Sequence, residues 1–311
     1  MSPRPLCIVN PAAANGRCGR MWPALRDRVA AALGPVDHEL TAAPLHATRL
    51  AREAATARRP LVVAVGGDGT VNEVVNGLLD GGRTRPEPPL GLLVLGTGGD
   101  LARTLDLPRR PADQVAVLAR ARPRRIDAGR ATCADSGGRA VTRDFVNIAS
   151  FGLSGATDAI VNRRPLLRRL GGRVAFLAAV AEALVRYRPE PVRVRVDACL
   201  DRVLMITTVA VCNGQYFGGG MRMAPGARLD DGRLDVVAVS GIGPIGLLWR
   251  LHRVYAGRHL ALPSVTFATG RSVGARAERA GARVPLDIDG ETPGFLPAAF
   301  DVLPGALTVL A

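Results

Sequence analysis

The sequence predicts an α/β domain followed by a β-rich domain. Up to about residue 122, short apolar runs alternate with segments of helical spacing; from about residue 125 onward, strand-like runs dominate. The charged, proline-containing stretch Arg122–Arg125 separates the two patterns. Continuous apolar runs are typical of parallel strands covered on both faces, and their alternation with helices is typical of an open α/β layer. We therefore expect an open, mostly parallel sheet over 1–124 and a largely antiparallel β domain over 125–311.

In the first domain, the apolar runs predict three buried strands, at Leu6–Val9, Leu61–Val65 and Leu92–Leu95. Met21, Leu25, Val29 and Leu33 recur at helical spacing and predict a helix over 19–33. Further helices are expected at 46–58, at 71–79 and from Asp100 to Leu105. The last of these has its acidic residue at the N-terminal end, where a helix favours negative charge.

In the second domain, strands are expected at Phe145–Phe151, Val192–Val196, Val203–Cys212, Leu234–Val239, Val265–Ala268, Val284–Ile288 and Ala306–Leu310. Helical segments near 154–163, 171–187 and 243–256 interrupt these strands. We expect the C-terminal tail to pack back on the first domain.

The composition fits a folded, basic protein. The chain has 311 residues, a formal net charge of +14, 48% apolar and 22% charged residues, so it can bury a core. Only 4% of the residues are aromatic, which disfavours an RNA-recognition sheet, and we expect no nucleic-acid partner. All 41 basic residues are arginine. This excludes a Walker A loop and a Schiff-base site, which need lysine, but the guanidinium group suits phosphate.

The cysteines and histidines indicate no metal site of their own. The five cysteines include no Cys-x-x-Cys pair, and the four histidines form no His-Glu-x-x-His motif. The N-terminal apolar run is too short for a signal peptide, and no apolar segment is long enough to span a bilayer. We therefore expect a cytoplasmic protein.

Two glycine-rich turns carry the sharpest local signal. Gly66–Thr70 follows one buried strand and precedes a helix, and Gly96–Asp100 stands in the same position after another strand. Glycines let the backbone turn tightly and approach a ligand, and the following helix N-terminus favours an anion. The carboxyl ends of parallel strands meet at one sheet edge, where ligands of open α/β sheets bind. These features predict a phosphate site.

The chain also resembles a known family. The resemblance follows nearly the whole chain in order, through Asn10-Pro11, Gly66–Thr70 with Val71–Leu78, Gly96-Thr97 with Asp100–Arg103, Phe145–Asn147 with Gly152, Ala224-Pro225, Asp231-Gly232, Asp289–Glu291 and Leu303–Leu307. These motifs are similar to those of the diacylglycerol kinase catalytic-domain family, above all its soluble bacterial lipid kinases. The superfamily also includes sphingosine and ceramide kinases.

This resemblance implies a C-terminal β-sandwich, an active site in the cleft between the domains, and ATP with Mg²⁺ as cofactors. It implies two catalytic residues: Glu291 as the general base that takes the proton of a lipid hydroxyl, and Asp68 as the residue that organises Mg²⁺ and water. It also implies the nucleotide-binding residues Asn10, Pro11, Thr41, Gly66, Gly67, Asp68, Gly69, Thr70, Val71, Asn72 and Thr97.

Two further positions follow from the resemblance. Asp231, with the backbone carbonyls of Arg228 and Arg233, matches a metal site that is structural in similar proteins. Gly99 departs from the family pattern, which usually has asparagine there. We expect this departure to weaken or alter the nucleotide contacts.

The basic, leucine-containing segment 163–173 is a candidate for contact with an anionic membrane, so a peripheral location at the inner membrane surface is expected. A solvated helix packed on the β domain is the alternative for this segment. The leading function is an ATP-dependent lipid kinase whose substrate has a free hydroxyl. An NAD kinase and a nucleotide- or membrane-binding homologue without turnover stay open, as does a homodimer.

Overall fold

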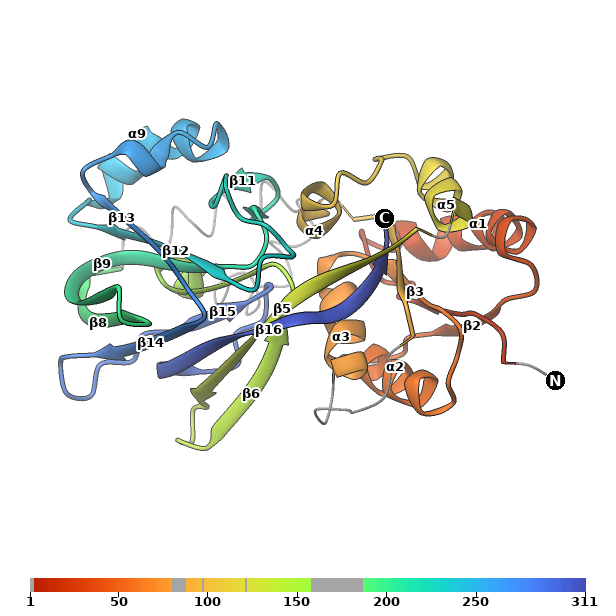
Figure 1. Cartoon of the computed structure of the whole chain (residues 1–311), viewed down its shortest axis with the longest axis horizontal. Coiled ribbons are helices and arrows are strands. Elements are labelled where there is room, and N and C mark those ends of the chain that lie inside the picture. Colours follow the sequence, from red (N-terminus) through yellow and green to blue (C-terminus); the bar gives the residue numbers. More distant parts are fainter. Residues whose placement is uncertain (1–2, 80–87, 97, 121, 158–186) are drawn as a thin grey trace. The chain divides into compact units, whose positions relative to one another are not determined.

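The computed structural model (Figure 1) describes residues 3–79, 88–96, 98–120, 122–157 and 187–311. Its contacts divide the chain into a first unit, Met1–Asp127 with Gly305–Ala311, and a second unit, Ala128–Pro304. The chain thus passes between the units at Asp127–Ala128 and again at Pro304–Gly305, and the C-terminal tail belongs to the first unit.

Parallel strands form the sheet of the first unit, in the order β16–β4–β3–β1–β2. The strands that lie wholly in this unit are β1 (Leu6–Val9), β2 (Asp37–Leu40), β3 (Val62–Gly66) and β4 (Leu90–Val94). The helices are α1 (Arg17–Leu33), α2 (His46–Thr56), α3 (Asp68–Leu79), α4 (Asp100–Thr104) and α5 (Pro111–Arg120). The predicted parallel α/β fold is confirmed. The strand β2 was not predicted, because its sequence is polar and it lies at the sheet edge.

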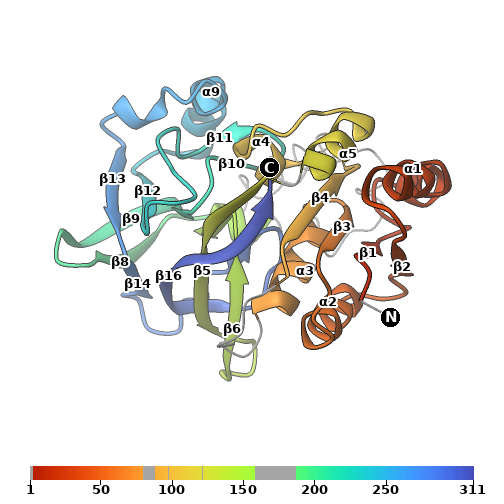
Figure 2. The same cartoon turned by 45° about the vertical axis from the view of Figure 1, so that its right-hand side comes forward.

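Helices cover both faces of this sheet. Figures 1 and 2 show α1 and α5 on one side of the strands and α2 and α3 on the other. The core under α1 and α5 joins Trp22 and Val29 of α1 to Leu118 of α5, to alternate residues of the strands, and to Leu310 of β16. Within the described ranges, no helix is long and apolar enough to cross a membrane.

The second unit is built mainly of antiparallel strands. They are β5 (Pro123–Ala134), β6 (Ala140–Phe145), β7 (Ile148–Gly152), β8 (Glu190–Val196), β9 (Leu200–Cys212), β10 (Tyr216–Phe217), β11 (Met221–Arg222), β12 (Leu234–Ser240), β13 (Val265–Gly270), β14 (Ser272–Ala277), β15 (Leu286–Ile288) and β16 (Phe295–Leu310). One α-helix, α9 (Pro244–Tyr255), and the short 3₁₀ helix η1 (His259–Ala261) follow β12. Strands β5 and β16 extend across the unit boundary.

Two apolar cores stabilise the second unit. The larger core includes Phe151 and Phe300, whose stacked rings are 6.1 Å apart between centroids. The smaller core lies on the opposite face of β12, since Val236 belongs to the first core and Val237 to the second. The smaller core includes Val254 of α9. The β-sandwich-like second domain is therefore confirmed as a fold class.

One predicted strand is wrong in its extent. The run Phe145–Phe151 forms two strands, β6 and β7, which are separated at Val146 and Asn147. The backbone N–H groups of these two residues donate to the carboxylate of Asp289 instead of to a neighbouring strand. The helix predicted at 154–163 is described only to residue 157, and the helix predicted at 171–187 lies almost wholly outside the described residues.

Gly77 allows the close approach of α3 to α2, and its replacement tests how tightly the first unit is packed. A Cβ at Gly77 would lie 2.2 Å from the backbone oxygen of Thr48. Gly77→Ala should therefore lower the free energy of unfolding by about 1–3 kcal/mol, because backbone cannot yield as a side chain can. Gly69→Ala, in the same helix but facing open space, is the matched control in urea unfolding. Equal stability of the two variants would contradict the prediction.

Candidate active site

The two glycine turns lie side by side at the carboxyl ends of β3 and β4. Leu95 N donates to Gly66 O at 2.8 Å, and a Cβ at Gly96 would lie 3.2 Å from the Cα of Gly67. A Cβ at Gly66 would lie 2.4 Å from Thr70 Oγ1. A side chain at Gly66 would therefore overlap Thr70, and one at Gly96 would press on the backbone of Gly67, so glycine favours the close packing of the two turns. Thr97, predicted to bind nucleotide, lies outside the described residues.

Asp68 joins the first turn to the second. Its Oδ2 accepts a hydrogen bond from Gly99 N at 2.8 Å, and its Oδ1 accepts one from Asp100 N at 3.0 Å. A Cβ at Gly98 would lie 2.2 Å from Asp68 Oδ2, so glycine at that position makes room for the carboxylate. A single side chain thus fixes the second turn against the start of α3.

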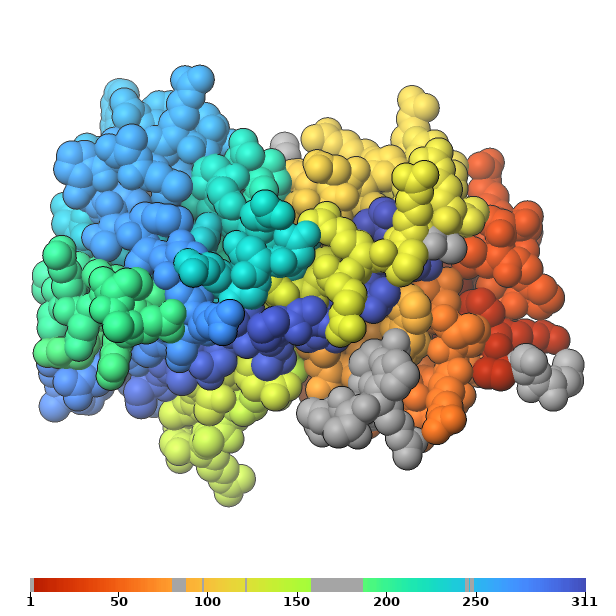
Figure 3. Space-filling model, viewed as in Figure 1, coloured from red at the N-terminus to blue at the C-terminus, as the bar shows by residue number. Residues whose placement is uncertain are grey.

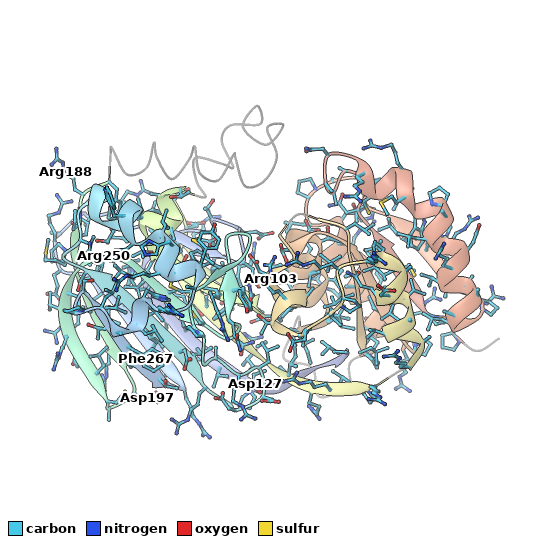
Figure 4. The ribbon with its side chains drawn as sticks, turned by 90° about the horizontal axis from the view of Figure 1, so that it is seen from above. Arg103, Asp127, Arg188, Asp197, Arg250 and Phe267 are labelled. Atoms are coloured by element: carbon cyan, nitrogen blue, oxygen red, sulfur yellow. The ribbon has the colours of Figure 1, made fainter. Side chains whose placement is uncertain are left out.

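Burial and polar contacts act on the pKa of Asp68 in opposite directions. Burial raises the pKa of this carboxyl above its ordinary value of 3.8, although the hydrogen bonds from Gly99 and Asp100 and the charge of Arg103 act in the opposite direction. Arg103, labelled in Figure 4, forms an ion pair with Asp100 on α4. The Arg103 guanidinium therefore has a carboxylate partner on its own helix.

The Asn10 loop lies at the same sheet edge. Asn10 Nδ2 donates to Thr70 Oγ1 at 3.0 Å, and Asn10 Oδ1 accepts from Ala12 N at 3.1 Å. Thr41 follows β2 and its N donates to Val9 O at 2.8 Å. The loops after β1, β2, β3 and β4 thus meet where ligands of an open α/β sheet bind.

The predicted nucleotide residues of α3 differ in accessibility. A Cβ at Gly67 or Gly69 would meet nothing within 4 Å, so a ligand has space to approach the backbone there. The first N–H groups of a helix also lack intrahelical partners. Val71 and Asn72 are buried in the unit, and Asn72 Oδ1 accepts from Asn76 Nδ2 at 3.1 Å. Their side chains therefore pack beneath this surface.

Gly99 adopts a left-handed conformation, with φ 63° and ψ 41°. Glycine enters this region without strain, and asparagine tolerates it better than most other residues. The replacement of the family's usual asparagine by Gly99 is therefore compatible with an unchanged turn.

The predicted general base belongs to the second unit, on the turn between β15 and β16. Ile288 and Glu291 exchange two backbone hydrogen bonds, of 2.8 and 3.0 Å. Asp289 has a positive φ of 48°. Gly290 also has a positive φ, and its N donates to Asp287 Oδ1 at 2.8 Å. The side chain of Glu291 is half-buried on a turn of fixed shape.

Asp289 fastens this turn to the segment between β6 and β7. Its Oδ2 accepts from Val146 N at 2.9 Å, and its Oδ1 accepts from Asn147 N at 3.2 Å and from Ile148 N at 2.8 Å. Asp289 N donates in return to Ile148 O at 3.1 Å. Three N–H donors on one carboxylate make Asp289 the residue that orients the turn of Glu291, a role that was not predicted.

The predicted metal residues lie on an exposed turn before β12. Arg233 N donates to Asp231 Oδ1 at 3.0 Å, and the Arg228 side chain pairs with Asp230. In the described part of the chain, no three His, Cys, Asp or Glu side chains cluster as a metal site. The predicted site uses one carboxylate and two carbonyls, and it stays a prediction.

Comparison with known proteins identifies the family. The diacylglycerol kinase catalytic domain matches residues 4–131, and the YegS C-terminal NAD kinase beta sandwich-like domain matches residues 147–311. A Chromohalobacter salexigens protein named "Probable lipid kinase YegS-like" is 34% identical over 85% of this chain and 79% of its own length. The chain belongs to the diacylglycerol kinase family. Diacylglycerol kinase of Bacillus subtilis is 31% identical over 82% of the chain and 78% of its own length.

Solved structures support the fold of this diacylglycerol kinase family member. A diacylglycerol kinase from Bacillus anthracis superposes with a TM-score of 0.71 at 22% identity, over 99% of this chain and 96% of that one. Yeast NADH kinase complexed with NADH superposes with a TM-score of 0.54 at 10% identity, over 99% of this chain and 83% of that one. The predicted family and enzyme class, a phosphotransferase that acts on an alcohol group, are confirmed.

Asp68→Asn should flatten the pH dependence of the first unit's stability. Because the pKa is raised on folding, the folded state holds the proton more tightly than the unfolded chain. The stability that Asp68 contributes is therefore fully present below pH 3.8 and is lost as the pH rises through the raised pKa. The variant cannot show this loss. In a Trp249→Phe background, urea unfolding followed by Trp22 fluorescence across that window measures the loss, with the exposed Asp27→Asn as control. Parallel profiles with and without Asp68→Asn would refute the prediction.

Proposed function

We propose that this protein is an ATP-dependent lipid kinase that transfers the γ-phosphoryl group to a lipid hydroxyl such as that of diacylglycerol. The observation that carries the proposal is the pair of glycine turns joined by Asp68, in a chain whose relatives are named diacylglycerol kinase. Phosphoryl transfer requires mainly positioning and neutralisation of charge. Backbone N–H groups and arginine provide both without lysine.

The first unit would bind the nucleotide. Its phosphates would approach the backbone at Gly67 and Gly69, where a Cβ would face open space. The N-terminal end of α3 favours an anion at that point. Asn10 holds Thr70 by a hydrogen bond and thereby supports the same turn. Thr41 and Thr97 are proposed as further contacts, with Thr97 resting on the family pattern alone.

Asp68 has the chemistry of a magnesium ligand, since Mg²⁺ prefers carboxylate oxygens. Each of its oxygens accepts a hydrogen bond from a backbone N–H group and has further lone pairs. When bound, Mg²⁺ would neutralise phosphate charge. We also propose that Asp231, with the carbonyls of Arg228 and Arg233, binds a structural cation, since hard cations accept such oxygen ligands.

Glu291 would act as the general base. In the proposed reaction, the lipid hydroxyl oxygen forms a bond to the γ-phosphorus, and the bond between that phosphorus and the bridging oxygen of ADP breaks. The hydroxyl proton goes to the Glu291 carboxylate. Asp289 acts through Glu291 as a positioning residue, because its three backbone hydrogen bonds fix the turn.

A lipid substrate implies work at a membrane surface. We propose a cytoplasmic protein that binds the inner membrane peripherally. The basic segment 163–173, predicted to contribute, lies outside the described residues. The further inference below concerns a different segment.

Parallel assays test the proposed reaction. Purified protein is incubated with γ-labelled ATP and Mg²⁺, and with either diacylglycerol in mixed micelles or NAD⁺. Label should appear in phosphatidic acid. Labelled NADP⁺ without labelled lipid would make the protein an NAD kinase. Bound ATP without transfer to any hydroxyl lipid of a total extract would support a binding protein.

Glu291→Gln tests the general base. We expect kcat to fall by about 10²–10⁴-fold, which is the usual contribution of a positioned base. The Kd for ATP should stay unchanged, because Glu291 belongs to the other unit from the glycine turns. Glu278→Gln removes a surface carboxylate of the second unit and is the control for charge. A Glu291→Gln enzyme with wild-type kcat would exclude this role.

A further inference from the structure

Helix α9 exposes an aromatic side chain that belongs to neither apolar core of the described second unit. Trp249 is 77% exposed, and Tyr255 at the end of the same helix is 42% exposed. Large aromatic side chains normally contribute their area to a core or an interface. Figure 3 shows the α9 region, in blue at the upper left, at the surface of the second unit.

The exposed stripe of α9 lies opposite its buried stripe. Val254 is buried in the smaller core of the second unit, and Leu251 packs against that core. At about 100° per residue, Trp249 lies about 140° from Val254 and about 160° from Leu251 around the helix. His252 and Arg253 are also exposed and lie on either side of Trp249. The helix is therefore amphipathic, with tryptophan and basic side chains turned away from the core.

The sequence around this helix carries charge of one sign. From Val236 to Ala277 the sequence contains no Asp or Glu, and it contains five arginines: Arg250, Arg253, Arg258, Arg271 and Arg276. Figure 4 labels Arg250 on α9. A long acid-free stretch with exposed arginines complements an anionic surface.

The sheet that α9 packs against also exposes a large apolar side chain, that of Phe267. Val237 of β12 belongs to the core that α9 covers, and it pairs directly with Phe267 of β13. Directly paired residues of antiparallel strands share a face, so Phe267 lies on the face that carries α9. Phe267, labelled in Figure 4, is 47% exposed. Aromatic groups therefore emerge from both the helix and the neighbouring edge strand.

We propose that α9 docks this protein on an anionic lipid bilayer, with Trp249 inserted at the headgroup level and Arg250 and Arg253 on the lipid phosphates. Tryptophan prefers this interfacial depth, and arginine on an amphipathic helix binds anionic lipid. The charge favours a bilayer over a second copy of this chain, because two such surfaces would bring like charges together. The proposal deepens the proposed function by naming the surface that reaches the lipid, but docking is measured without turnover.

Tryptophan fluorescence provides a direct test, because the chain has two tryptophans and the other, Trp22, is buried in the first unit. In Trp22→Phe, Trp249 is the sole reporter. Vesicles of phosphatidylcholine with 30% phosphatidylglycerol should shift its emission to the blue, and brominated acyl chains should quench it. Vesicles of phosphatidylcholine alone should do neither. Sedimentation of Trp22→Phe with anionic vesicles while its Trp249 emission is unchanged would overturn the proposal.

Matched variants separate the surface from the total charge. Arg250→Gln/Arg253→Gln should weaken sedimentation with anionic vesicles by about 25-fold, about fivefold for each arginine. Trp249→Ala should weaken it by about tenfold. Arg109→Gln/Arg110→Gln removes the same charge from exposed positions of the first unit and should change it less than twofold. Equal losses in the two double variants would overturn the proposal.

Two readouts distinguish the remaining outcomes. If α9 docks the kinase, Trp249→Ala should lose turnover on diacylglycerol in vesicles and keep it on a short-chain, monomeric diacylglycerol. Docking without phosphorylation of either substrate would support the docking proposal and refute the proposed lipid kinase activity. A blue shift of Trp249 that depends on protein concentration without vesicles, with dimers in sedimentation velocity, would assign α9 to a second copy and refute the docking proposal.

Discussion

Aspartate carboxylates that accept backbone N–H groups from distant loops hold the functional turns of both units. Asp68 binds the amides of Gly99 and Asp100, and Asp289 binds those of three residues more than 140 positions earlier. Hydrogen bonds to an ionised acceptor are shorter and stronger than neutral ones. Each carboxylate uses both oxygens, so it fixes the orientation of a loop as well as its position. In both units the carboxylate holds the backbone of a turn in one orientation. At Asp68, the lack of a side chain at Gly98 leaves space for the carboxylate.

Local pattern was sufficient for most of the fold. The apolar runs of β1, β3 and β4 identify buried parallel strands. Of the residues whose spacing predicts α1, Leu25 and Val29 are on its buried side, together with Trp22, which the pattern did not include. The local pattern failed where a contact with a residue distant in the sequence determined the secondary structure. The apolar run that contains Val146 reads as one strand because nothing near it reveals that its amides bond to Asp289. Strand β2 reads as a loop because an edge strand needs few apolar residues.

The sequence predicted which loops form the candidate site, but it did not predict the hydrogen bonds between them. Glycine spacing after β3 and β4 indicates where the backbone turns, but the partner of Asp68 lies 31 positions away. The turn that carries Glu291 was predicted only through its Asp-Gly-Glu motif, Asp289–Glu291. The orienting function of Asp289 in that motif has no local signal, since an acidic residue in a turn usually faces water. Trp249 illustrates the same limit: its helix was expected, whereas its exposure depends on which side meets the core.

The path of β16 has a consequence for biosynthesis. Its last residues complete the first unit, since Val309 pairs with Leu90 of β4 and Leu310 joins the core under α1. A ribosome makes this segment only after the entire second unit, so the sheet of the first unit stays incomplete throughout that time. Until then β4 presents a free apolar edge, which is a template for pairing with another nascent chain. The first unit therefore reaches its full set of strands only after the second unit has been synthesised.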